Sequence, residues 1–170
     1  YADIMPIDGL KITLNGTLTS YDSRGTDATQ PFYGYSRTAY PTGFVSRSSD
    51  QTYSYNFQQL VNYHHEFGHH HMEILLGHEF YRSRYENLFG AKTGMASYFT
   101  NQTLAGAIKL DTTGENGNSA YESEGFFARG QYDYDQKYFG SLSYRRDASS
   151  RFDPDHRWGN FYSLGGAWII

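Results

Sequence analysis

Apolar and polar residues alternate along several stretches of the chain with a period of two. In the clearest stretch, residues 10–21, Leu10, Ile12 and Leu14 share one parity, while lysine, asparagine and threonine hold the other. A period of two places the apolar side chains on one face of a β-strand, whereas a helix would spread them around its axis. The pattern therefore predicts a strand with one apolar and one polar face.

The same alternation predicts six strands. Their expected ranges are 9–21, 51–66, 70–84, 120–134, 137–147 and 157–170. Gln59 and Leu60 interrupt the alternation of the second strand, and a β-bulge there is one explanation. A tilted strand needs about 9–11 residues to cross a bilayer, whereas strands of globular proteins most often have about 5–6. The lengths of these runs therefore favour strands that cross a membrane.

The expected connections alternate between short and long. Short turns are expected at 66–69 and 134–137, an intermediate connection at 146–157, and long polar connections at 22–50 and 86–119. Outer-membrane β-barrels have this asymmetry, with short periplasmic turns and long extracellular loops. Six strands are fewer than the roughly eight of the smallest such barrels. We therefore predict an all-β, antiparallel transmembrane barrel segment, with tyrosine and tryptophan near the strand ends forming girdles at the membrane interfaces.

Composition narrows the alternatives. Aromatic residues make up 18% of the chain, which favours strands with one oily and one wet side. The net charge of −4 gives no basic footprint for nucleic acid, and the absence of cysteine excludes disulfides and thiolate metal sites. No apolar run is long enough for a transmembrane helix, and we expect no signal peptide within these residues.

Several motifs resemble those of a known family. They are residues 140–152 (GSLSYRRDASSRF), Pro154, Trp158-Gly159 and residues 164–168 (LGGAW), together with residues 75–79 (LLGHE) and 127–134 (FARGQYDY). The set is similar to the C-terminal half of SusC/RagA proteins, which are TonB-dependent outer-membrane transporters. The resemblance covers most of residues 51–170 and is most specific from residue 121 onward.

The resemblance implies a barrel of about 22 strands with a plug in its lumen. It implies import of oligosaccharides or peptides across the outer membrane of Bacteroidetes, with energy supplied through TonB and a SusD-like lipoprotein as a lid. We expect the plug and the TonB-contacting segment to lie outside this chain, so no coupling residue can be carried onto it. A passive porin or adhesin barrel is the main alternative; a soluble sugar-binding sandwich and an outer-membrane hydrolase are two others.

Charged residues of polar parity are candidates for the lumen. They are Lys11, Glu73, Glu79, Arg129, Asp133, Arg145 and Asp147. On the lipid side, an arginine or lysine at mid-depth would cost about 2–4 kcal/mol. We expect these side chains to pair within the wall and with the plug in preference to contacting substrate.

Aromatic residues gather in the expected long loops. They are Phe32, Tyr33, Tyr35, Tyr40, Phe44, Phe89, Tyr98 and Phe99. They could stack on substrate or the lid protein, or pack on one another to order the loops, and the sequence favours neither.

No pattern predicts a catalytic or metal site. His64 and His65 lie across a turn from residues 69–71, and His69 and His71 share a strand face and could meet a cation, but a histidine-rich polar turn is the preferred interpretation. His78-Glu79 begins a zinc-protease motif, but the second histidine would fall at Arg82. The acid pairs Glu122/Glu124 and Asp153/Asp155 lie two residues apart on one segment, which leaves no cleft for a sugar. We expect no cofactor and no enzyme activity.

Overall fold

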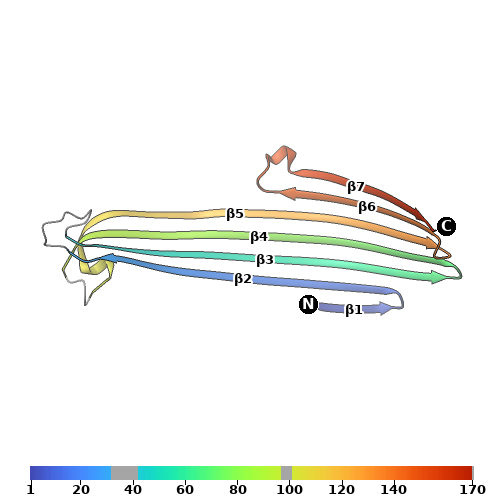
Figure 1. Ribbon diagram of the computed structural model, residues 1–170, viewed down its shortest axis with the longest axis horizontal. Helices are drawn as coiled ribbons and strands as arrows, with labels where there is room; N and C mark the ends of the chain where they lie inside the picture. The colour runs from blue at the N-terminus through green and yellow to red at the C-terminus, as the bar shows by residue number, and fades with distance from the viewer. Residues whose placement is uncertain (32–41, 97–100, 170) are drawn as a thin grey trace. The chain divides into compact units, whose positions relative to one another are not determined.

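The structure, a computed structural model, describes residues 1–31, 42–96 and 101–169, which form one seven-stranded sheet. The strands are β1 (Ala2–Ile7), β2 (Leu10–Thr29), β3 (Phe44–Phe67), β4 (His70–Met95), β5 (Ala107–Tyr134), β6 (Tyr138–Ser149) and β7 (Trp158–Trp168). Each strand neighbours the next along the chain, and β1 and β7 are the edges (Figure 1). The pairings of β1 with β2, β5 with β6 and β6 with β7 are antiparallel, which confirms the predicted all-β, antiparallel class.

Two single 3-10 turns complete the described elements, η1 (Leu104–Gly106) and η2 (Pro154–His156). The Asp153 carboxylate caps η2 by accepting the backbone N–H of Asp155 at 3.0 Å, so the connection from β6 to β7 is ordered locally. Within the described ranges, no helix is long and apolar enough to cross a membrane.

The structure corrects the expected strand boundaries. A seventh strand, β1, pairs with β2, whereas the sequence predicted six strands. The expected loops at 22–50 and 86–119 are wrong in extent, because β2 and β3 together occupy residues 10–29 and 44–67, and β4 and β5 occupy residues 70–95 and 107–134. Polar, Gly-rich sequence indicated a loop, but a strand does not need regular apolar alternation to form. Such a strand is held by backbone hydrogen bonds to neighbours of similar length.

The residues fall into two compact units. Unit 1 contains Tyr1–Leu18, Ser54–Ser83 and Tyr121–Ile170, and unit 2 contains Thr19–Tyr53 and Arg84–Ala120. Each unit is described separately below.

Tight turns join the strands of unit 1, as the sequence predicted for 66–69 and 134–137. Asp135 and Gln136 between β5 and β6 have positive φ values of 55° and 52°, and Gly68 between β3 and β4 has 59°. Gly9 between β1 and β2 has φ 79°, and a Cβ there would lie 2.2 Å from the backbone oxygen of His64. Only glycine fits at position 9, and the short turns fix the strand register.

The register of β5, β6 and β7 gives unit 1 two distinct faces. Residues opposite one another on neighbouring strands point to the same side of the sheet. Gly130 pairs with Leu142 and Leu142 with Leu164, whereas Arg129 pairs with Ser143 and Ser143 with Ser163. The predicted alternation is therefore confirmed, and the apolar residues of all three strands lie on the same face.

Side-chain contacts extend both faces to the other strands of unit 1. The Phe126 ring stacks on His78 at 4.5 Å, and Tyr55 lies 5.8 Å from Phe80, all on the apolar side. We call the apolar face the surface formed by Leu10, Ile12, Leu14, Tyr55, Phe57, Ile74, Leu76, Phe126, Leu142, Tyr144, Leu164 and Trp168. The polar face is formed by Asp3, Lys11, Thr13, Asn62, Glu73, Glu79, Arg129, Asp133, Ser143, Arg145, Asp147 and Ser163.

Side chains alternate regularly between the two faces along the part of β3 that belongs to unit 1. Tyr55 contacts Phe80, and the Gln59 side chain lies 3.2 Å from that of His78, so both point to the side of the apolar face. No bulge therefore separates these positions, and the explanation offered for the interruption at Gln59 and Leu60 is wrong. A polar residue occupies an apolar-face position there because His78 supplies it with a hydrogen-bond partner.

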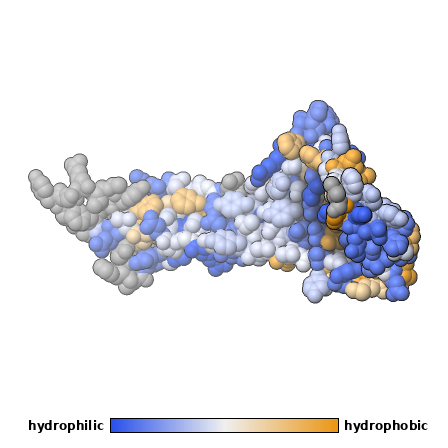
Figure 2. Space-filling view, turned by 45° about the vertical axis from the view of Figure 1, so that its right-hand side comes forward, coloured by the Kyte–Doolittle hydropathy of each residue, from blue (hydrophilic) through white to orange (hydrophobic). Residues whose placement is uncertain are grey.

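Large apolar side chains of unit 1 are exposed. Leu142 is 59% exposed, Leu164 85% and Trp168 62%. Figure 2 shows hydrophobic and hydrophilic residues side by side on the surface in view, toward the right of the picture. Unit 2 differs, because Val45, Met95 and Ala107 form a small buried cluster against which Ala28 and Leu104 pack.

Candidate functional site

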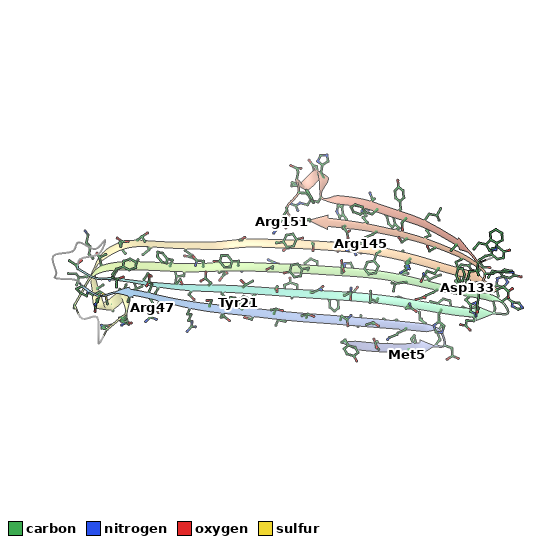
Figure 3. All side chains as sticks on the ribbon, in the orientation of Figure 1. Met5, Tyr21, Arg47, Asp133, Arg145 and Arg151 are labelled. Carbon is green, nitrogen blue, oxygen red and sulfur yellow. The ribbon has the colours of Figure 1, made fainter. Side chains whose placement is uncertain are left out.

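The charged candidates all lie on the polar face of unit 1. Glu79 is on β4, Arg129 and Asp133 are on β5, and Arg145 and Asp147 are on β6. Figure 3 shows Asp133 near the turn that joins β5 to β6 and Arg145 farther along β6. The shared parity places these side chains on one surface, and the register decides which of them meet.

Arg145 is the centre of the largest polar network on this face. Its Nε donates to both carboxylate oxygens of Asp147 at 2.8 Å, and its Nη2 forms an ion pair with Glu79 on β4. Its guanidinium carbon also lies 5.5 Å from the centre of the Phe127 ring. A planar guanidinium can satisfy two carboxylates and an aromatic face at once, which a lysine ammonium cannot do in the same geometry. The network ties together β4, β5 and β6.

Two glycines make room for this network. A Cβ at Gly125 would lie 2.6 Å from Oδ1 of Asp147, and a Cβ at Gly77 would lie 2.1 Å from an atom of the Phe127 ring. The carboxylate and the ring therefore pack directly on strand backbone. The sequence analysis did not single out Gly77, Gly125 or Phe127. A glycine on the polar face that lies opposite a large side chain would have pointed to this packing. Which residues face one another is known only once the strand register is known.

Other residues of the polar face also pair with side chains of neighbouring strands or turns. Asp133 lies 3.0 Å from Nδ1 of His71, and Lys11 lies 3.0 Å from Asp3 of β1. Asn62 donates to Glu73 at 2.8 Å. Within the described ranges Arg129 has no charged partner, and its cross-strand neighbour is Ser143. Pairing within the wall thus accounts for Arg145 and Asp133 but leaves Arg129 open to another molecule or segment.

A groove of about 490 Å³ lies beside the Arg145 network. That volume falls in the range of about 300–1,000 Å³ that is typical of small-molecule sites. Its lining combines charged groups with aromatic side chains from β5, from β7 and from the connection between β6 and β7. The charged and aromatic residues that line it are Glu79, Tyr121, Glu124, Arg145, Asp147, Phe152, His156, Arg157, Trp158 and Phe161. The groove offers stacking surfaces and both signs of charge within one concavity.

A continuous row of rings crosses the apolar face beside the tight turns. We call it the proximal belt, and it consists of Tyr63, His65, Phe67, His70, Tyr134, Tyr138 and Trp168. Neighbouring ring centres lie 4.7–6.4 Å apart, and the row spans five strands, from β3 to β7. The Tyr132 hydroxyl lies 2.6 Å from Nδ1 of His70 and so gives the imidazole a polar partner. Rows of this kind mark the interface between hydrocarbon and water in membrane barrels.

A second group of rings lies farther from the turns. This distal belt contains Tyr55, His78, Phe80, Phe126 and Trp158. On β7, Trp158 and Trp168 have the same parity and lie ten residues apart. At about 3.4 Å per residue and a tilt of about 40°, they are separated by about 26 Å along the barrel axis. The apolar band of an outer-membrane barrel is about 25 Å tall, so the two belts have the spacing of two membrane interfaces.

The structure describes only two of the loop aromatics, and neither lies in a loop. Phe44 is the first residue of β3 and Phe89 lies within β4, so their assignment to long loops is corrected. The strand pairing of β3 and β4 reaches farther than the polar composition suggested. Six other candidates lie outside the described residues: Phe32, Tyr33, Tyr35, Tyr40, Tyr98 and Phe99.

Unit 2 contains a polar cluster that the sequence did not indicate. The Asp50 carboxylate accepts hydrogen bonds from the Tyr85 hydroxyl at 2.7 Å and from the Asn87 amide at 2.8 Å. These donors favour the charged carboxylate, so the pKa of Asp50 is lowered, while the same bond to Asp50 raises the pKa of Tyr85. Asp50 therefore stays ionised near neutral pH and links β3 to β4.

The histidine-rich turn divides its side chains among separate partners. His69 lies 3.0 Å from Asp135, His71 lies 3.0 Å from Asp133, and His70 contacts Tyr132. In the described part of the chain, no three histidine, aspartate or glutamate residues are grouped as a metal ion requires. The turn is thus built from local pairs, which fits the preferred interpretation of a polar turn.

Comparisons with known proteins agree on one type of protein, although no family model matches the chain. TonB-dependent receptor P39 of Formosa agariphila is 41% identical over 61 residues, covering 36% of this chain and 6% of the relative. TonB-dependent receptor P3 of the same organism is 28% identical over 130 residues, covering 74% of this chain and 12% of the relative. The chain therefore spans only a small part of the length of these relatives.

Solved structures match nearly the whole chain. A structure of the RagAB peptide transporter superposes with a TM-score of 0.89 at 25% identity, over 96% of this chain and 18% of that one. The open-open state of the RagAB peptide importer gives a TM-score of 0.87 over the same shares of both chains, again at 25% identity. The resemblance to TonB-dependent receptors of the SusC/RagA type is confirmed. The fold is a segment of their antiparallel β-barrel, and these relatives are named as receptors and transporters rather than as enzymes.

Proposed function

We propose that this chain forms part of the wall of a TonB-dependent importer in a bacterial outer membrane. Its apolar face contacts lipid and its polar face lines the lumen. The observation that carries the proposal is the uncovered apolar face, where Leu142 and Leu164 are 59% and 85% exposed between two aromatic belts. An apolar surface of this extent is unfavourable in water and favourable in hydrocarbon.

The polar face supplies contacts for whatever fills or crosses the lumen. The Arg145 network and the His71–Asp133 pair are satisfied within the wall, so their role is to hold neighbouring strands in register. Arg129 and the groove beside Arg145 are the positions that can bind the plug or a passing cargo, because they present charge and aromatic surface that the wall does not use. The chemistry of the site is binding, gating and passage.

The proposed assembly includes the parts that the family resemblance implies. TonB acts through a plug-bearing segment outside this chain, and a SusD-like lipoprotein covers the extracellular side. The cargo is an oligosaccharide or a peptide. The name of the RagAB peptide transporter supports a peptide cargo for that protein, and similarity over 96% of this chain makes a peptide the first cargo to test here.

Uptake by intact cells tests the proposal. A strain that lacks the full-length gene would be complemented with the wild-type gene, and accumulation of labelled peptides and labelled oligosaccharides would be measured in parallel. We expect the gene to restore accumulation of one cargo class, and we expect deletion of TonB or addition of an uncoupler to abolish it. Accumulation that needs the gene but not TonB would instead support a passive porin. Failure of every cargo in cells that display the folded protein would contradict import.

A further inference from the structure

We propose that the apolar face carries a binding site for a phosphate-bearing lipid. Arg146, oriented by Trp158, binds the phosphate, and an apolar hollow floored by Gly130 and Gly140 receives an acyl chain. The inference rests on the proposed function only in requiring that the apolar face meets a bilayer. Arg146 and the hollow lie on the opposite face from Arg129 and Arg145, and Trp158 is the one residue that the lipid site shares with the groove beside Arg145.

Adjacent arginines of β6 have opposite surroundings. Arg145 points to the polar face and has two carboxylate partners, Glu79 and Asp147. Arg146 points to the apolar face, where Asn160 of β7 is its cross-strand neighbour. Its guanidinium carbon lies 4.8 Å from the centre of the Trp158 ring, and none of the described residues forms an ion pair with it. The nearest carboxylate of the same parity on β5, Glu124, is paired with Nε2 of His78 at 3.0 Å, so Arg146 keeps a positive charge that no ion pair among the described residues satisfies.

The position of Arg146 determines which anion can reach it. Trp158 belongs to the distal belt, which has the spacing of a membrane interface. Lipid phosphates lie at that level, and the carboxylate bonded to the belt there, Glu124, is held by His78. The indole holds one face of the guanidinium by a cation–π contact and leaves its in-plane N–H donors free. Those donors form the planar fork that binds phosphate through two parallel hydrogen bonds.

The apolar hollow lies on the same face, toward the proximal belt. It has a volume of about 420 Å³ and is lined chiefly by Met72, Ile74, Tyr132, Leu142 and Leu164 around the two glycines. A Cβ added at Gly130 or Gly140 would meet nothing within 4 Å, so the depression is open. Gly140 lies six residues from Arg146, which is about 20 Å along the strand and, at a tilt of about 40°, about 15 Å in depth. Half of a hydrocarbon core of about 30 Å has that depth, so one acyl chain reaches from the phosphate to the hollow.

Lipid retention by the full-length protein tests the site. The delipidated protein in detergent would be titrated with phosphatidic acid or with diacylglycerol of the same chains, and bound lipid would be counted by native mass spectrometry. These probes differ only in the phosphate. We expect the wild type to prefer phosphatidic acid, and Arg146→Gln to lower that preference at least tenfold. Arg129→Gln is the matched control, because Arg129 is an exposed arginine without a charged partner on the opposite face, and we expect no change.

Two further arms separate the parts of the proposal. Gly140→Leu places a side chain in the hollow from a Cβ that meets nothing within 4 Å, and we expect it to weaken binding of both lipids while leaving the preference for phosphate intact. Inorganic phosphate at millimolar concentration should fail to displace the lipid; displacement would mean a simple anion site and would overturn the proposal. Equal losses in Arg146→Gln and Arg129→Gln, or no loss in either, would also overturn it. Heat-dependent gel mobility checks that each variant is folded.

The outcome can be separated from that of the proposed function. TonB-dependent uptake together with unchanged lipid binding by Arg146→Gln would refute the lipid site alone. A phosphate preference that depends on Arg146, in a protein whose uptake does not need TonB, would refute active import alone.

Discussion

Units 1 and 2 belong to one sheet, but unit 2 buries apolar side chains whereas unit 1 exposes them. In unit 2, Val45 is fully buried and Met95 and Ala107 are 6% and 2% exposed, so aliphatic groups pack on one another. In unit 1, none of the described apolar side chains is buried to that degree, and Leu164 is 85% exposed. Every hydrophobic residue in the buried set lies in unit 2.

The difference indicates which solvent each unit requires. A soluble sheet must cover its apolar face with a second layer, because apolar surface in water is costly. Unit 2 supplies part of such cover from its own connections, since Leu104 of η1 packs on the Val45 cluster. Unit 1 has an apolar face bounded by two aromatic belts, and none of the described residues forms a second layer over it, as expected if this face meets the bilayer as proposed.

The largest effect should come from a charge placed on the apolar face between the belts. Leu142→Arg puts a guanidinium at mid-depth, and we expect the full-length barrel to lose about 2–4 kcal/mol of folding free energy in lipid. Ser143→Arg, one residue along on the polar face, is the control and should have little effect. Urea titration of folding into vesicles measures both variants. Equal losses would contradict the assignment of the two faces.

A truncation in the buried cluster of unit 2 should have the next largest effect. Met95→Ala removes a side chain that is only 6% exposed. We expect the free energy of unfolding to fall by about 2 kcal/mol, which is the lower end of the range for truncating a buried methionine. Leu164→Ala on the apolar face should cost much less, because hydrocarbon refills the vacated space. Hydrogen exchange near residue 95 and denaturant titration measure the pair. A larger loss at Leu164 would mean that this side chain packs on protein.

A methyl group at Gly77 should have a moderate effect. In Gly77→Ala the new Cβ would lie 2.1 Å from an atom of the Phe127 ring, so the ring must shift and its contact with Arg145 changes. We expect a loss of about 1–3 kcal/mol, which is typical of overpacking. Gly130→Ala is the control, because its Cβ meets nothing within 4 Å. The same vesicle-folding assay compares them, and indifference to both changes would show that Phe127 does not lie on Gly77.

The smallest effect should come from the exposed ion pair across β4 and β6. Glu79 and Arg145 are 32% and 46% exposed at their side chains, so water and salt screen their attraction. A double-mutant cycle of Glu79→Gln and Arg145→Met should give a coupling of about 0.2–1 kcal/mol that weakens at high salt. A coupling of several kcal/mol, insensitive to salt, would show that the polar face is closed to water.

The sequence could predict which residues of a strand share a face. Alternation along 10–21 and 137–147 depends only on local side-chain direction, so it placed Leu142, Arg145 and Asp147 on their correct faces before any pairing was known. At residues 22–29 and 86–95 apolar residues are few and do not alternate regularly, so the pattern carried no strand signal and the strands were mistaken for loops.

The contacts between strands could not be predicted in the same way. The contact of Phe127 with Gly77 and the ion pair of Glu79 with Arg145 depend on the strand register, which the turn geometry sets. Arg146 was not among the candidates, although it shares the parity of Leu142. Its contact with Trp158, which register and rotamer decide, is what places its guanidinium at a belt.

The exposure of the two faces to lipid and water is the most direct test. Single cysteines at Leu142, Leu164, Ser141 and Ser163, placed in the full-length protein with no other reactive thiol, would carry a fluorophore in vesicles. Quenchers fixed on lipid acyl chains should quench the two leucine positions strongly and the two serine positions weakly, and a water-soluble quencher should give the reverse order. Quenching of Leu142 and Leu164 from water alone would contradict a membrane-spanning wall.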